Sequence, residues 1–470
     1  MGNNKQKIIE YFNKVATIRD KFIRRNRDYY RDLVSFFNYN IPAGSKVLEI
    51  GCGTGYLLEA LQLKNAWGID ISEEMIVHAK KKHPQFTFRV EDIENCTLDE
   101  KFDVIILSDT VGYFADIQKA FANIRQLCHC NTRIIITYQS FFWGPFLRIA
   151  EVLKLKMTHP RLNWLNKNDI HNLLKLEGYS LIKDGRRFLF PKFFPLLSCL
   201  CNKYLVHLPF FNLFGLTGYS IARPNLPDET LNGISIVIPA RNEKGNIEKA
   251  LLQMPQFDVP FEIIFIEGNS TDNTYEEIER VYEAYKDKFE LQYAKQDGKG
   301  KGDAVRKGFG MARYEVLMIL DADLTVGPEE LPKFYNAIAS GCGEYINGSR
   351  LVYPMEKEAM RFLNIMGNKF FSKMFSWLLG QRLKDTLCGT KVLSKRNWQQ
   401  VSQNRSYFGN FDPFGDFDII FGSAKLNLQI VEIPIRYKAR DYGDTNISRF
   451  RHGWLLLKMV FFAMNKIKFV

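Results

Sequence analysis

The chain has 470 residues, of which 46% are hydrophobic and 25% are charged, values that are ordinary for a folded globular protein. This composition excludes a largely disordered chain, and the length predicts two or three domains. The formal net charge of +12 indicates an anionic partner, such as a phosphate-bearing substrate or an acidic membrane surface. No RNA- or DNA-binding signature accompanies the charge, so we expect no nucleic-acid partner.

The two ends of the chain bear on where the protein works. The N-terminus is polar (MGNNKQK), so we expect no secretory signal, and the eight cysteines then indicate reduced thiols in a cytoplasmic protein. The last segment, WLLLKMVFFAMNKIKFV (454–470), threads lysines through apolar residues. Two interpretations of it stay open: an amphipathic helix peripheral on the inner face of the membrane, and a helix packed on the preceding domain.

The first half of the chain alternates short apolar runs with helix-like segments. The runs predict strands at 46–50, 66–69, 104–107 and 133–137, with closing strands at 179–183 and 218–222. Such alternation predicts a parallel sheet with right-handed crossovers. We therefore expect an α/β domain over residues 1–224.

A glycine-rich loop, EIGCGTG (49–55), follows the first predicted strand and precedes a helix. Glycines at such a turn let a ligand approach the backbone at a helix N-terminus. The next apolar run ends at Asp70, where a carboxylate can accept hydrogen bonds from ribose hydroxyls. A third run ends at Asp92 and Ile93, beside the expected position of an adenine ring.

These residues resemble class I methyltransferases, and the resemblance covers about residues 11–223. It implies a Rossmann-like fold, a lid helix at YFNKVATIRD (11–20) and the cofactor S-adenosyl-L-methionine. The cofactor-binding residues that it implies are Glu49, Gly51, Gly53, Gly55, Asp70, Asp92 and Ile93. Methyl transfer needs little more than alignment of the reacting groups. Asp109, after the fourth strand, is our candidate for a catalytic base where the acceptor is protonated.

A polar segment with two prolines, RPNLPDETLNG (223–233), separates the two halves, and we expect a linker at 225–233. Strand–helix alternation then resumes, with strands predicted at 234–238, 262–266, 291–294 and 316–320. This pattern predicts a second α/β domain over residues 234–445. A basic amphipathic tail, 446–470, follows it.

Four motifs follow in order in this second domain: IPARNE (238–243), IEGNSTDNT (266–274), QDGKGKGDAVRKG (296–308) and LDADL (320–324). They resemble family 2 glycosyltransferases with a GT-A fold, and most closely the dolichol- and polyprenyl-phosphate sugar synthases. The resemblance implies inverting transfer of a sugar from a nucleotide-sugar donor. The donor-binding residues that it implies are Pro239, Arg241, Glu243, Glu267, Asp272, Lys301, Asp303, Asp321 and Asp323.

Asp321 and Asp323 also form the candidate metal site. They flank one alanine at the end of an apolar strand, and two carboxylates on a tight turn suit Mg²⁺ or Mn²⁺. The resembled synthases often carry a glutamine two residues beyond the second aspartate. Here that residue is Thr325, so the third protein ligand stays open.

The acceptor side of the second domain is less defined. By resemblance, Arg350 and Arg361 would hold an acceptor phosphate, for which a guanidinium fork is well suited. Asp416 and Asp418 are the candidates for a catalytic base. A true base would indicate a hydroxyl acceptor, whereas an anionic phosphate acceptor needs no base.

The sequence thus predicts two α/β domains in series and a bifunctional transferase. The second domain would move a sugar to a polyprenyl phosphate or to a glycan or lipid hydroxyl, and the first would methylate a related substrate. In the alternative, the first half is a non-catalytic module that binds S-adenosylmethionine or serves as a scaffold. A third interpretation, a nucleic-acid methyltransferase, rests on the positive charge alone.

Overall fold

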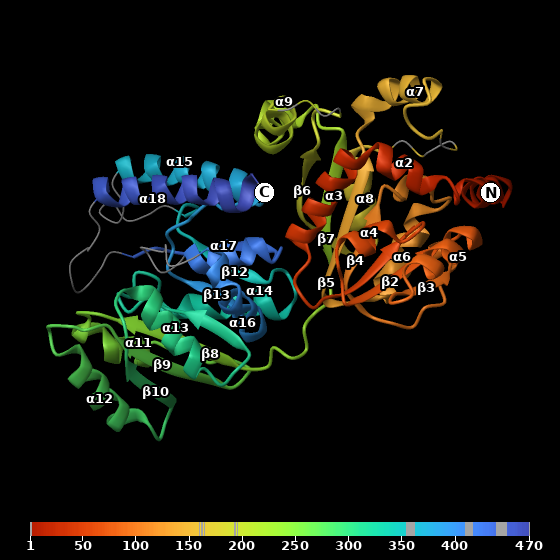
Figure 1. Cartoon of the computed structure of the whole chain (residues 1–470). Helices are drawn as coiled ribbons and strands as arrows, with labels where there is room; N and C mark the ends of the chain where they lie inside the picture. Colours follow the sequence, from red (N-terminus) through yellow and green to blue (C-terminus); the bar gives the residue numbers. More distant parts are fainter. Residues whose placement is uncertain are drawn as a thin grey trace. The chain divides into compact units, whose positions relative to one another are not determined.

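The computed structural model describes residues 2–158, 160, 163, 165–191, 194, 196–353, 362–408, 417–438 and 449–469. The chain divides into two compact units, with the division between Leu226 and Pro227, inside the segment expected to be the linker (Figure 1). Each unit is an α/β domain, so the predicted fold class is confirmed. No disulfide joins the eight cysteines, all of which lie among the described residues.

The first unit is built on a seven-stranded sheet with the order β3-β2-β1-β4-β5-β7-β6. Strands β1 to β5 are parallel, whereas β7 runs antiparallel to both β5 and β6. The bounds are β1 Lys46–Ile50, β2 Asn65–Asp70, β3 Thr87–Val90, β4 Phe102–Ser108, β5 Cys128–Gln139, β6 Tyr179–Arg187 and β7 Thr217–Pro224. The loops after β1, β2 and β4 therefore meet at the carboxyl edge of the sheet.

Helices pack on both faces of this sheet, over two hydrophobic clusters that share its central strands. Side chains cap three of them: Ser72 accepts from the backbone of α5, Asp116 from α6, and Asn166 forms a capping box with α8. The bounds are α1 Gly2–Val15, α2 Arg19–Arg25, α3 Arg27–Asn40, α4 Tyr56–Ala60, α5 Glu73–Lys82, α6 Ile117–Gln126, α7 Gly144–Val152, α8 Lys167–Leu176, α9 Leu197–Cys199 and α10 Pro209–Asn212.

The second unit has its own seven-stranded sheet with the order β10-β9-β8-β11-β13-β12-β14. Strands β8 to β11 are parallel, and β13 runs antiparallel between β11 and β12. The bounds are β8 Ile234–Ala240, β9 Phe261–Glu267, β10 Glu290–Lys295, β11 Val316–Ile319, β12 Tyr345–Ser349, β13 Lys391–Ser394 and β14 Ile430–Pro434.

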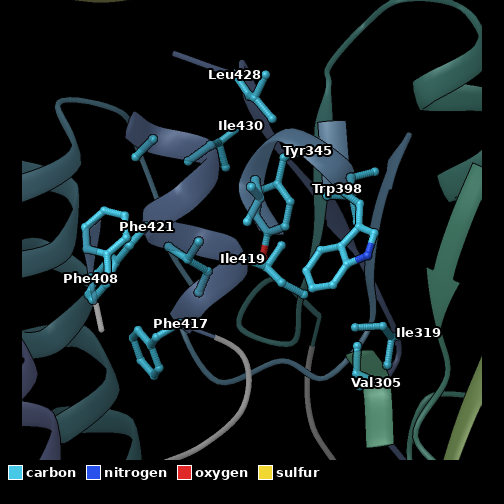
Figure 2. Packing of buried hydrophobic residues seen from close by; sticks show 14 of the residues in the cluster. Val305, Ile319, Tyr345, Trp398, Phe408, Phe417, Ile419, Phe421, Leu428 and Ile430 are labelled. Atoms are coloured by element: carbon cyan, nitrogen blue, oxygen red, sulfur yellow. The ribbon is translucent and has the colours of Figure 1, made fainter. Parts of the chain in front are cut away.

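Two hydrophobic clusters hold the helices of the second unit to its sheet. Figure 2 shows part of one of them, in which Ile419 lies near Tyr345, and Trp398 near Ile319. The helices are α11 Ile247–Leu252, α12 Thr274–Tyr285, α13 Lys301–Met311, α14 Leu331–Ala339, α15 Phe362–Leu379, α16 Lys395–Gln403, α17 Phe417–Lys425 and α18 Arg449–Ala463.

The predicted tail contains α18, which packs against α15 within the second unit. Leu456, Met459, Val460 and Ala463 are buried in the same cluster as the aromatic side chains of α17, whereas Trp454 and Phe461 stay exposed. Of the two interpretations of the tail, packing on the preceding domain accounts for its buried face. Within the described part of the chain, no helix has the length and apolar character needed to span a bilayer.

Candidate functional sites

The glycine loop after β1 is folded for close approach. Gly51, Gly53 and Gly55 all have positive φ, of 76°, 53° and 78°. A Cβ at Gly51 would lie 2.5 Å from the Thr110 side chain, and one at Gly53 would lie 2.7 Å from Arg19 Nε. Gly51 and Gly53 are therefore required for two reasons: their backbone conformation, and the lack of space for a side chain.

A cavity of about 490 Å³ lies along this loop and is lined by six of the seven residues predicted to bind the cofactor. The exception is Gly55, at which a Cβ would meet the Phe88 ring at 2.8 Å. Asp70 accepts hydrogen bonds from the backbone N–H of Gly53 and of Ser72, both at 2.9 Å. These bonds hold the loop against the end of β2.

Two further predicted residues line the cavity beside β3. The carboxylate of Asp92 accepts from Lys5 Nζ of α1 at 2.5 Å and from the backbone N–H of Glu94 at 3.1 Å. Ile93 is buried next to it. Because Lys5 also lines the cavity, α1 forms part of its wall.

Glu49 is a buried acid of this site with a raised pKa. Its side chain is 4% exposed, and its Oε2 has no hydrogen-bond partner. Burial raises the pKa of Glu49 to about 8, although the positive charge of Arg19 opposes the rise. A buried, unsatisfied carboxylate beside a glycine cradle suits a ligand that carries a hydrogen-bond donor or a positive charge. The residues of the cavity thus fit S-adenosylmethionine, whose amino group and sulfonium are both cationic.

Arg19 is a cavity residue that was not among our predicted sites. It begins α2, and its charge acts on Glu49 and Asp70 as well as on Tyr30 and Tyr113. The sequence places Arg19 in the predicted lid segment at 11–20, close to the cofactor site. It does not show that the side chain of Arg19 turns toward the glycine loop.

Asp109 lines the same cavity, directly after β4, and has a φ of 54°. Its carboxylate accepts from the Tyr29 hydroxyl and, at 3.2 Å, from Thr137 Oγ1. Burial raises the pKa of Asp109, against the two hydrogen bonds, which lower it. Lys156 lines the cavity nearby, and burial lowers its pKa. The cavity therefore contains a partly buried acid and a partly buried amine, each of which can exchange a proton.

In the second unit, the predicted donor-binding residues gather at the carboxyl ends of β8 and β9. Glu243 accepts from Asn246 Nδ2 at 2.7 Å, and its own N–H donates to Thr274 Oγ1. Glu267 accepts from the backbone N–H of Ser270 at 2.5 Å. Asp272 accepts from the N–H of Lys244 and from Thr274. Pro239 pairs with Ile266 of β9, one residue before the end of the parallel pairing, and Arg241 is exposed beside Gly268.

Asp321 and Asp323 follow β11, at the same edge of the sheet. Lys301, the first residue of α13, pairs with Asp321 Oδ1 at 2.6 Å, whereas Asp303 accepts from the N–H of Gly298. Burial acts to raise the pKa of Asp321, but the positive charges of Lys301, Lys391 and Arg350 together hold the pKa below its ordinary value. Asp321 therefore stays ionised at neutral pH.

The second aspartate is held by its own turn. Asp323 Oδ1 accepts from the N–H of Thr325 at 3.1 Å and from its hydroxyl at 2.8 Å. Thr325, the residue in doubt as a third metal ligand, is thus bonded to Asp323 and is 4% exposed.

Two residues beside Asp321 were not foreseen. A Cβ at Gly389 would lie 1.7 Å from Asp321 Oδ2, so only glycine fits there. Lys391 is fully buried in β13, donates to the Cys388 carbonyl, and adds positive charge near Asp321.

The two carboxylates fit a divalent cation, since both are hard oxygen donors at one strand end. Among the described residues, no group of three or more His, Cys, Asp or Glu side chains could hold a metal ion. The remaining ligands would therefore have to be diphosphate oxygens and water, which is usual for Mg²⁺.

The predicted acceptor residues are engaged within the protein. Arg350 makes a two-point pair with buried Asp385, with Nε and Nη2 each 2.7 Å from a carboxylate oxygen. Asp418, in the first turn of α17, pairs with Arg405 at 2.8 Å and with Arg306 at 3.6 Å. Arg361 and Asp416 lie outside the described residues.

Comparison with known families identifies both units. Residues 22–184 match the model of a methyltransferase domain, and residues 235–396 match that of glycosyl transferase family 2. The predicted pair of transferase domains is therefore confirmed.

Several characterised proteins are similar to one half of the chain or the other. The second half is 33% identical over 238 residues to a dolichol-phosphate mannosyltransferase of Pyrococcus furiosus, covering 48% of this chain and 64% of that protein. It is also 29% identical over 226 residues to the low-salt glycan biosynthesis hexosyltransferase Agl6 of Haloferax volcanii, covering 47% and 51%. The first half is 36% identical over 146 residues to a malonyl-[acyl-carrier protein] O-methyltransferase of Bacillus cytotoxicus, covering 29% and 50%. The chain thus spans about half the length of the last two.

Proposed function

Because this chain joins a methyltransferase domain to a family 2 glycosyltransferase domain, we propose that it is a bifunctional transferase. The first unit methylates an acceptor with S-adenosylmethionine, and the second transfers a sugar from a nucleotide-sugar. The observation that carries this proposal is that each unit collects its motif residues at the carboxyl edge of its own sheet. Ligands of open α/β sheets bind at such edges.

In the first unit, the chain's task is to hold and align the reactants. The glycine loop, Asp70 and Asp109 all line the cavity. When bound, the cofactor supplies an activated methyl group. Asp109 takes the acceptor proton through its carboxylate, while Tyr29 and Thr137 fix the orientation of that carboxylate. A binding module without catalysis would have no use for an acid held in this way, which favours turnover over a scaffold role.

In the second unit, Asp321 and Asp323 would hold a divalent cation, which would supply positive charge for the leaving nucleotide. Lys301, which pairs with Asp321 in this structure, would then be free to contact the donor diphosphate. Attack by the acceptor on the face opposite the diphosphate inverts the anomeric centre.

The acceptor of the second unit is either a polyprenyl phosphate or a hydroxyl of a glycan or lipid. One observation favours the phosphate: the Asp418 carboxylate is already paired with two guanidinium groups. These two pairs hold the Asp418 carboxylate inside the protein, where it is not free to approach an acceptor hydroxyl, and a phosphate acceptor needs no base.

The first experiment is a screen of the full-length protein for slow hydrolysis of UDP- and GDP-sugars with Mn²⁺ present. We expect one donor to be hydrolysed, and chelation of the metal to abolish the reaction. Adding a polyprenyl phosphate or a lipid-linked glycan should then convert hydrolysis to transfer. Metal-independent hydrolysis, or no turnover of any nucleotide-sugar with either acceptor, would refute the assignment.

A further inference from the structure

The exposed apolar side chains of the first unit are concentrated in two segments, 141–153 and 194–213. Thirteen of the seventeen large hydrophobic residues that are exposed among the unit's described residues lie in these 33 positions. Figure 1 shows α7 and α9, which belong to the two segments, at the same end of the unit. A concentration of this kind on one face marks an interaction surface.

The two segments are joined to each other. Trp143 Nε1 donates to the Phe214 carbonyl at 2.7 Å, directly after the second segment. The Phe142 and Phe210 rings lie 5.4 and 5.5 Å from the Phe214 ring. We call the surface formed by residues 141–153 and 194–213 the apolar face.

Helix α7 is apolar on two sides, which is unusual for a helix at a surface. Leu147 and Ala150 line the cavity of the first unit. Ile149, Val152 and Leu153 point away from it and are 58%, 81% and 61% exposed. A helix that is apolar nearly all round is stable in water only when a second apolar surface covers its outer side.

The cavity opens onto the apolar face. The Phe146 ring lines the cavity and is also 54% exposed, so it stands at the mouth. Lys156, Asp109 and the glycine loop line the same cavity. A molecule whose apolar part lay against the apolar face could thus reach the cofactor with its polar end.

The charges of the two segments indicate what covers the face. The two segments carry two basic residues, Arg148 and Lys203, and one acidic residue, Glu151, and two further lysines, Lys154 and Lys156, follow the first segment directly. Glu151 itself pairs with Lys156 at 3.3 Å. Apolar side chains edged by cations are typical of proteins that insert shallowly into an anionic bilayer.

We propose that the apolar face docks on an anionic lipid bilayer, and that the methyl acceptor enters the cavity from that bilayer as an amphipathic lipid. The proposed docking is supported by the exposed residues of the apolar face alone. The proposal that the acceptor is a lipid also rests on the proposed methyltransferase function. The polar end of the lipid would meet Lys156 and Asp109, and its chain would leave past Phe146.

Flotation of the full-length protein with vesicles tests the docking. The vesicles are phosphatidylcholine with and without about a quarter of phosphatidylglycerol. We expect binding to the anionic vesicles, with a loss of at least about tenfold in the double variant Ile149→Glu, Val152→Glu. Neither residue lines the cavity. The matched control is Val77→Glu in α5, which is 54% exposed away from the apolar face and should bind as the unchanged protein does.

Three results would overturn the proposal: no binding to anionic vesicles, equal binding to neutral ones, or equal binding by the double variant. A self-associating protein that becomes monomeric in the double variant without binding vesicles would make the face a protein interface instead. Binding of S-adenosylmethionine, measured by calorimetry, shows whether the first unit of the double variant is folded. If the double variant is unfolded, Leu200→Glu replaces it in the flotation experiment. Failure of vesicle binding with intact cofactor binding would refute the docking and leave the methyltransferase proposal standing.

Discussion

The substitution Glu49→Gln should stabilise the ligand-free first unit while weakening its hold on the cofactor. Glu49 is buried with an unpaired oxygen, and its pKa is about 8 in the folded protein against an ordinary value of 4.5. Between these values the unfolded chain is ionised at this position and the folded chain is protonated. Stability therefore falls as the pH rises from 4.5 to 8.

The size of the effect follows from the two pKa values. Each pH unit between them is worth about 1.36 kcal/mol, so ionisation of Glu49 costs the folded unit about 4 kcal/mol at pH 8. Glutamine keeps the shape of the side chain and removes the ionisation. The stability difference should be near zero at pH 4.5, grow through neutrality and level off above pH 8.

Differential scanning calorimetry of the full-length protein measures this difference. The transition of the first unit is identified by its upward shift on adding S-adenosylmethionine. At about 2–4 °C per kcal/mol, the variant should melt roughly 10 °C higher at pH 8. Glu59→Gln, an exposed carboxyl on α4, is the control and should change little. A Glu49→Gln variant that is less stable at pH 8, or whose gain is the same at every pH, would refute the reasoning.

Three further substitutions test separate parts of the two sites. Gly389→Ala should lower metal-dependent donor hydrolysis by about a hundredfold or more, because its Cβ would collide with Asp321 Oδ2; Gly310→Ala, which meets nothing within 4 Å, should not. Arg350→Ala should destabilise the second unit by about 3–5 kcal/mol in thermal unfolding, because it leaves the buried Asp385 carboxylate without its cationic partner. A variant with weaker acceptor binding and unchanged stability would contradict this. Tyr29→Phe removes a hydrogen bond that lowers the pKa of Asp109, so the acidic limb of the methyl-transfer rate should move to higher pH; an unmoved limb would exclude Asp109 as the base.

The parts of the sites that the sequence predicts are those held by short stretches of chain. The glycine loop and Asp70 follow strands that their apolar runs reveal, and Asp321 and Asp323 sit on one turn. Their approximate positions follow once the strands are known to be parallel, because parallel strands present their carboxyl ends together.

Side chains brought in from distant segments could not be predicted in the same way. Gly389 meets Asp321 only because β13 pairs antiparallel beside β11. Arg350 was expected to hold a phosphate, but the fold supplies Asp385 as an internal partner 35 residues later. The sequence shows the charge of Arg350 and gives no sign of that partner.

The apolar face was visible in the sequence only in part. The run 188–216 is rich in Phe and Leu, yet its composition does not distinguish core from surface. Which side chains stay exposed depends on how Phe214 meets Trp143 across the fold. The sequence shows that these residues are apolar, and the tertiary packing determines which of them are exposed.

The central claim, that one chain carries two separate transferase sites, is tested most directly by Asp70→Ala and Asp323→Ala in the full-length protein. For each variant, calorimetry measures S-adenosylmethionine binding, and the donor screen measures metal-dependent sugar release. The account predicts that Asp70→Ala loses cofactor binding and keeps sugar release, and that Asp323→Ala does the reverse. If either change removed both activities from a well-folded protein, the claim of two independent sites would be contradicted.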